Sequence, residues 1–186
     1  MTTYIAFDGE TRIAAGSLPA VVERCKTLLD ARPDALPMIY DDATGRPVDI
    51  DYRGTTHDVL ARLPGSEAPA KRGPGRPRLG VVAREVTLMP RHWDWLANQP
   101  GGASVALRRL VEAASRDRGA ADRQRQAAEA VDRVMMALAG NLPGYEEAAR
   151  AFHRRDTERF AILTEYWPTD IREYVRVLAS RVGGEA

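Results

Sequence analysis

The chain has few of the residues that mark secreted, membrane or metal-binding proteins. Its 186 residues include a single cysteine, Cys25, which excludes an internal disulfide and favours a reducing compartment. The longest apolar run, 134–139, is far shorter than the roughly 20 residues that a membrane-spanning helix needs. The N-terminus lacks the basic and apolar segments of a signal peptide. We therefore expect a cytoplasmic protein that makes no membrane contact.

Histidine is also scarce, and its positions give no metal site. His57, His92 and His153 lie far apart, and none has a second ligand at metal-binding spacing. Cys25 falls on the apolar face of a predicted helix, where a thiol is usually inert. No set of acid, base and nucleophile is visible. We expect no metal, no cofactor, no catalytic residue and no enzymatic activity.

Positive charge gathers in the middle of the chain, although the net charge is only +1. Residues 1–63 carry 7 basic and 10 acidic groups, and residues 119–186 carry 10 and 11. Residues 64–80 carry 4 basic groups against 1 acidic group, and residues 81–118 carry 6 against 4. A local excess of this kind is the electrostatic footprint of a nucleic-acid site.

The fold class that the sequence predicts is α+β, with a small ββαββα unit over residues 1–63. Asp8-Gly9 is a typical hairpin turn between two short strands. Residues 19–31 have the apolar spacing of one helix face. A second hairpin is expected over 37–41 and 47–52, followed by a short helix.

The rest of the chain divides into a linker, a central segment and a helical end. Residues 64–80 predict a flexible basic linker, because 64–78 contain four prolines and three glycines. Residues 81–118 form the central segment. Residues 119–186 predict a helical bundle, whose last helix, about 170–182, has the cleanest amphipathic pattern.

The linker contains Lys-Arg-Gly-Pro-Gly-Arg-Pro-Arg at 71–78, which resembles an AT-hook with its Gly-Arg-Pro core. The minor groove of DNA is about 6 Å wide and admits an extended chain but no helix. Narrow A·T-rich grooves attract arginine. By this resemblance, Arg76 and Arg78 enter the groove on either side of Pro77. The expected contacts are Lys71, Arg72, Gly75, Arg76, Pro77 and Arg78. Pro74 replaces a usual basic residue, and the alternative is a plain linker with solvated arginines.

The central segment resembles a ribbon-helix-helix domain. It predicts a strand over 81–89, a helix over 90–99, a break at Pro100-Gly101-Gly102 and a second helix capped by Ser104 and ending near residue 115. In that fold two chains pair their strands into an antiparallel ribbon that enters the major groove.

The resemblance assigns residues of this segment to two faces. Those expected to contact DNA are Arg84, Glu85, Thr87, Ser104, Val105 and Arg108. Those expected to form the dimer interface are Val86, Leu88, Trp93, Leu107, Leu110 and Val111. Glu85 fits poorly, because phosphate repels a carboxylate unless the carboxylate accepts a bond from a cytosine amino group. The alternative is a segment that only dimerises or packs internally.

Four stretches resemble a bacterial family known only as domain-of-unknown-function family 2239. They are residues 75–88, 101–111, 142–148 and 167–172. The resemblance implies a bacterial and complete chain, and it supplies no activity.

These observations lead to one favoured function and two alternatives. The favoured function is that of a transcription regulator or nucleoid-associated factor, binding A·T-rich DNA as a homodimer or higher oligomer. The first alternative is an antitoxin-like or adaptor protein, whose central helices dimerise and whose C-terminal helices bind a protein partner. An enzyme acting through the acidic N-terminal unit is the least favoured.

Overall fold

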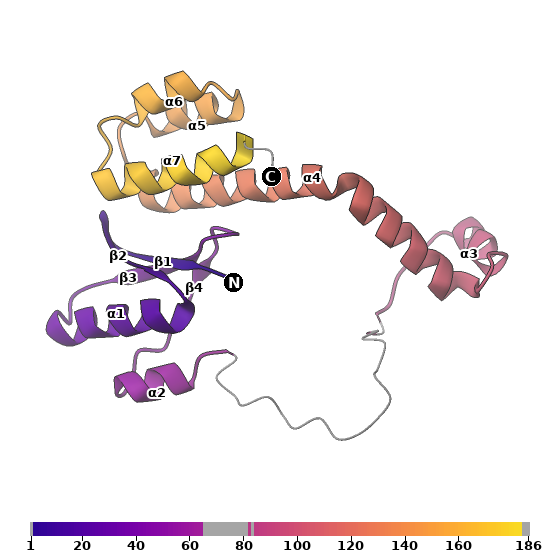
Figure 1. Cartoon of the computed structure of the whole chain (residues 1–186), viewed down its shortest axis with the longest axis horizontal. Helices are drawn as coiled ribbons and strands as arrows, with labels where there is room; N and C mark the ends of the chain where they lie inside the picture. Colours follow the sequence, from indigo (N-terminus) through magenta and orange to yellow (C-terminus); the bar gives the residue numbers. More distant parts are fainter. Residues whose placement is uncertain (1, 65–81, 83, 184–186) are drawn as a thin grey trace. The chain divides into compact units, whose positions relative to one another are not determined.

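The computed structural model describes residues 2–64, 82 and 84–183 (Figure 1). The chain divides into two compact units. The first unit comprises Met1–Ala68 and Arg123–Ala186, and the second comprises Pro69–Asp122. The α+β class is confirmed. Of the helices formed by the described residues, none is both long and apolar enough to cross a membrane.

A four-stranded antiparallel sheet forms the centre of the first unit. Its strands are β1 (Tyr4–Asp8), β2 (Thr11–Gly16), β3 (Pro37–Asp41) and β4 (Pro47–Val48), in the order β2-β1-β3-β4. Helix α1 (Leu18–Ala31) follows β2, and α2 (Thr56–Ala61) follows β4. The predicted order ββαββα is therefore confirmed.

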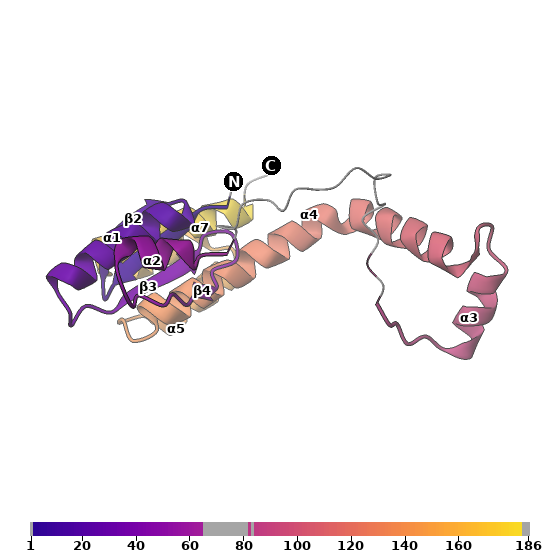
Figure 2. The same cartoon turned by 90° about the horizontal axis from the view of Figure 1, so that it is seen from below.

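The sheet is buried on both faces, because successive residues of a strand point to opposite sides. Ile5 and Phe7 of β1 belong to one hydrophobic core, whereas Ala6 between them belongs to the other. The core around Ala6 is completed by α1 and α2. Figure 2, which is seen from below, shows these two helices in front of the strands. The apolar side chains on this side are Val21, Val22, Cys25, Ile39, Val59 and Leu63.

The other face of the sheet is covered by helices from the C-terminal part of the chain. These are the end of α4 (Gly102–Ala139) and α7 (Thr169–Gly183), and α5 (Tyr145–His153) and α6 (Thr157–Leu163) pack outside them (Figure 1). The rings of Phe7 and Tyr174 lie 5.7 Å apart, centroid to centroid. The buried residues that α4 and α7 contribute are Ala130, Val131, Val134, Met135, Ala139, Ile171, Tyr174, Val175 and Leu178.

Polar contacts also join the sheet to these helices. The backbone N–H of Arg12 donates to Asp170 Oδ2 at 2.7 Å. Arg181 pairs with Asp42 at 2.9 Å, and Arg133 Nη1 donates to the carbonyl of Thr44 at 2.7 Å. The sequence predicts 1–63 and 119–186 as separate domains. In the structure they share one core, because the outer face of the sheet and the apolar stripe of α7 bury each other.

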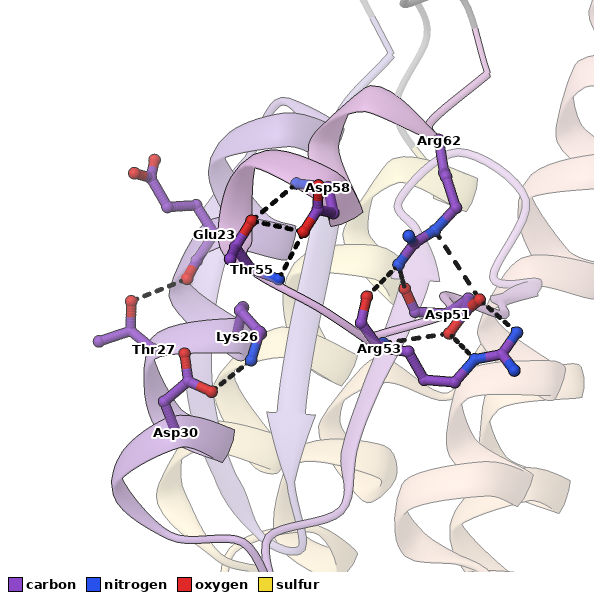
Figure 3. Close-up of polar contacts among 9 residues, drawn as sticks. All are labelled: Glu23, Lys26, Thr27, Asp30, Asp51, Arg53, Thr55, Asp58 and Arg62. Carbon is purple, nitrogen blue, oxygen red and sulfur yellow. Dashed lines mark hydrogen bonds and ion pairs between the residues drawn. The ribbon is translucent and has the colours of Figure 1, made fainter.

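The second strand of the second hairpin is shorter than predicted. We expected residues 47–52, but β4 ends at Val48. The backbone that follows is held by side chains instead of a neighbouring strand (Figure 3). Arg62 donates to the carbonyls of Asp51 and Arg53, and the Asp51 carboxylate pairs with Arg53 at 2.7 Å. The hydrogen bonds from Arg53 hold the pKa of Asp51 well below its usual range. Thr55 and Asp58 then form a capping box that starts α2.

The break that we expected between the central segment and the helical end is also absent. Helix α4 runs without interruption from Gly102 to Ala139, through Gly119. A single helical glycine costs only about 1 kcal/mol relative to alanine. A helix of 38 residues tolerates that cost. Ion pairs one turn apart, such as Arg133–Glu129 at 2.8 Å, add a small favourable term.

Candidate nucleic-acid interface

The predicted DNA contacts fall on the linker and on the second unit. The hook residues Lys71, Arg72, Gly75, Arg76, Pro77 and Arg78 lie outside the described residues. The segment that resembles a ribbon-helix-helix domain is described from residue 84 onward. The second unit thus supplies the geometry of the candidate interface.

Residues 84–89 form no strand, and all of them except Leu88 are exposed. The prediction of a strand over 81–89 is therefore wrong for the described residues of this segment in the single chain. A strand needs a neighbour to supply its ladder of hydrogen bonds. Within the described part of the second unit, no other strand is present to pair with it. Arg84, Glu85 and Thr87 are exposed, and Leu88 is half-buried.

Helix α3 (Pro90–Ala97) follows this segment, two residues shorter than the predicted 90–99. It begins on Pro90, whose fixed φ and missing N–H suit a first helical position. Leu96 faces inward and is buried, whereas Trp93 and Trp95 are exposed. Most of the apolar surface of α3 therefore has no covering within this unit.

A tight glycine turn joins α3 to α4. Gly101 and Gly102 adopt φ values of 85° and 74°, a region that other L-residues enter at a cost. A Cβ on Gly101 would also lie 3.1 Å from the Cβ of Val105. The predicted break at residues 100–102 is confirmed. Both glycines meet a backbone requirement, and Gly101 meets a packing requirement as well.

Helix α4 starts at this turn, so Ser104 lies in its first turn and is not its N-cap. The prediction of Ser104 as the cap is wrong, because the glycine turn lets the helix begin three residues earlier, at Gly102. The N–H group of Ser104 still belongs to the helix N-terminus, where the first four N–H groups lack intrahelical acceptors, and Val105 follows directly after it. The side chain of Arg108 reaches back and donates from Nε to the Ser104 carbonyl at 3.2 Å. This turn therefore places N–H groups and one guanidinium close together.

The predicted dimer residues are largely uncovered in the single chain. Val86 is 55% exposed, Trp93 41%, Leu110 49% and Val111 65%, while Leu88 and Leu107 are half-buried. Met89 and Trp95, which the sequence analysis did not assign, are exposed as well. Across the described residues of the second unit, only Leu96 and Ala106 are buried.

Several arginines of this unit are also free of acidic partners. Arg84, Arg91, Arg108 and Arg109 are exposed, and none makes a salt bridge within the described part of the chain. Arg116 is paired with Glu112, at 4.0 Å. Unpaired exposed guanidinium groups can contact phosphate without first breaking an ion pair.

A family model now gives the chain its place among known sequences. The model described as "Uncharacterized protein conserved in bacteria (DUF2239)" matches residues 3–179. The chain belongs to this family. The match spans residues of both the first unit and the second unit. No curated protein and no solved structure matches the chain.

Two features of the first unit were not foreseen from sequence. A cavity opens between α5, α6 and α7, and Arg155 at its edge has a positive φ of 59°. No short motif signals either one, because the cavity is lined by residues far apart in sequence. Where the structure describes side chains, no group of three or more His, Cys, Asp or Glu is arranged to hold a metal ion.

Proposed function

We propose that this protein is a DNA-binding dimer, acting as a bacterial transcription regulator or nucleoid-associated factor. The observation that carries the proposal is the second unit, whose described residues bury only Leu96 and Ala106. A segment of this size with so little core does not hold its fold alone. It needs a partner to cover its apolar side chains.

A second copy of the same chain is the partner that fits best. The uncovered residues include Val86, Trp93, Leu110 and Val111, which are the positions that a ribbon-helix-helix dimer would bury. Pairing of residues 84–89 from two chains would also supply the missing hydrogen-bond ladder. One event would then satisfy both the exposed backbone and the exposed apolar surface.

The polar side of the same segment suits DNA. The ribbon would present Thr87 to base edges in the major groove, where all four base pairs differ. The N–H group of Ser104, beside Val105, and the side chain of Arg108 would meet phosphate at the helix N-terminus. The hook, with Arg76 and Arg78, would add minor-groove affinity for A·T-rich sequence. Glu85 remains the residue that phosphate disfavours.

The two parts make different contributions, and variants separate them. Arg76→Ala with Arg78→Ala should weaken binding to A·T-rich duplexes and flatten the salt slope by roughly 1–2 units. Thr87→Val should leave the salt slope nearly unchanged and alter preference by about 1–3 kcal/mol at one or two positions. Titrations on matched A·T-rich and G·C-rich duplexes at several salt concentrations measure both effects.

A matched control removes the same charge elsewhere. Arg154 and Arg159 are exposed arginines of the first unit, and their joint replacement by alanine should leave DNA affinity near wild type. If the variant with Arg76→Ala and Arg78→Ala binds DNA like wild type, the Gly-Arg-Pro stretch is only a linker. Thr87 variants that change nothing would make the ribbon a dimerisation device.

An adaptor or antitoxin-like protein is the second candidate, and the same coreless unit favours it. A different protein, instead of a second copy, would then cover Trp93 and Leu110. In the single chain the apolar stripe of α7 is already buried against the sheet. A partner of the C-terminal helices would therefore use exposed residues such as Ile162 and Tyr166. Stoichiometric co-purification with one such protein, and no DNA affinity, would favour this function.

A further inference from the structure

A cavity of about 260 Å³ lies in the first unit between α5, α6 and α7. Its inner wall is apolar, with Phe152, Phe160, Ala161, Ala179 and Val182 buried or half-buried around it. An apolar cavity of about 150 Å³ can hold a benzene molecule. The space here is therefore large enough for one aromatic ring or branched aliphatic group and a short polar extension.

Arg155 stands at the edge of this cavity in an unfavourable backbone conformation. Its φ of 59° makes it the one non-glycine residue with positive φ in the part of the chain that the structure describes. It closes α5, with its N–H bonded to the Phe152 carbonyl at 2.9 Å and the next N–H, of Asp156, bonded to Ala151 at 3.0 Å. Glycine is the usual residue at such a helix end, because it lacks the Cβ that strains this conformation.

The guanidinium of Arg155 is exposed and has neither a hydrogen bond nor an ion pair within the described residues. The other charged groups around the cavity are already engaged. Arg176 donates to Thr164 at 2.9 Å and pairs with Glu165 at 2.9 Å. Asp156 accepts the N–H of Arg159 at 2.9 Å and so caps α6. The free charge at the mouth of the cavity is thus a single positive one.

We propose that this cavity binds a small organic monoanion, a carboxylate attached to one aromatic or branched aliphatic group. The apolar part would fill the space between Phe152, Phe160 and Ala179, and the carboxylate would pair with Arg155 at the opening. A residue held in a strained backbone conformation is a pointer to function at that place. Arginine in place of glycine here adds a cation that has no acidic partner, unlike Arg176, which pairs with Glu165. The site lies wholly in the first unit and does not depend on DNA binding.

Calorimetric titration of the full chain with phenylacetate, and with the neutral isostere phenylacetamide, tests the proposal. Phenylacetate should bind saturably and phenylacetamide at least about tenfold more weakly, because a charge-assisted bond is lost. Arg155→Gly should lower the affinity for phenylacetate by a similar factor. Its melting temperature should stay level or rise by about 2–4 °C, since glycine relieves the backbone strain at this position. Arg155→Lys should keep most of the binding.

Two control variants locate the site. Arg154→Gly removes the neighbouring charge outside the cavity wall and should leave phenylacetate affinity unchanged. Ala179→Phe fills the cavity and should abolish binding while the chain stays folded by circular dichroism. The absence of saturable phenylacetate binding to wild type would overturn the proposal. Equal affinity for the amide, or full affinity in Arg155→Gly, would overturn it as well.

Discussion

Gly45 sits where the turn between β3 and β4 touches helix α4. It has a φ of 65°, and its N–H bonds to the Asp41 carbonyl at 2.8 Å. A Cβ at this position would lie 2.5 Å from the Ala130 carbonyl oxygen and 3.0 Å from the Ala130 Cα. These are backbone atoms, so no side-chain rotation relieves the overlap. Gly45→Ala therefore tests whether the sheet and the C-terminal helices share one body.

The expected loss of stability has two parts. The left-handed backbone costs alanine about 1–2 kcal/mol relative to glycine. Forcing the turn away from α4 costs about 1–3 kcal/mol more, as over-packing of a tight contact does. Gly9→Ala is the matched control, because Gly9 also has positive φ, of 57°, but nothing lies within 4 Å of its Cβ position. The Gly9→Ala control should lose only the backbone cost of about 1–2 kcal/mol in its free energy of unfolding.

Urea unfolding followed by circular dichroism measures both variants. The difference between them should be about 1–3 kcal/mol, which displaces the midpoint by roughly 1 M at the usual slope. Equal losses in Gly45→Ala and Gly9→Ala would refute the close packing of this turn on α4. Such a result would favour the sequence-based prediction that residues 1–63 and 119–186 form separate domains.

Three further outcomes are expected. Leu110→Asp should convert the dimer to a monomer by light scattering and keep the helical signal, because Leu110 is exposed in the single chain. Burial raises the pKa of the Cys25 thiol, so Ellman's reagent should react with it only in denaturant. The hydrogen bond from Arg176, with the nearby charge of Arg172, lowers the pKa of Glu165. Its stabilisation is full above the ordinary pKa and lost as pH falls through the lowered one, so Glu165→Gln should destabilise at neutral pH and match wild type in acid.

Local patterns were enough to predict the first hairpin turn and the start of α3, because the relevant signals lie within a few residues. Asp8-Gly9 marks the first turn, and Pro90 the start of α3. The continuity of α4 was missed, since Gly119 resembles a break and only its long helical context overrides it. The burial of the sheet on both faces was also missed, because a short strand such as Tyr4–Asp8 does not show which distant helix covers it.

The candidate site shows the same limit. The positions assigned to a dimer interface came from the resemblance to a ribbon-helix-helix domain, and most of them are exposed in the single chain. The apolar spacing of 81–89 could not show whether these residues form a strand, because a strand needs a neighbouring strand for its hydrogen bonds. The cavity beside Arg155 depends on three helices meeting, and on a backbone conformation that arginine rarely adopts. No short sequence pattern indicates the meeting of the three helices or the backbone conformation of Arg155.

The most direct test of the DNA-binding proposal is the salt dependence of affinity for A·T-rich duplex DNA. Fluorescence anisotropy of the wild-type protein with a labelled duplex, at several potassium chloride concentrations, gives the slope of log affinity against log salt. The account predicts tighter binding to A·T-rich than to G·C-rich duplexes, with a slope of about −3 or steeper, since each neutralised phosphate contributes about 0.9. No binding at low salt, or an affinity that ignores salt and base composition, would contradict it.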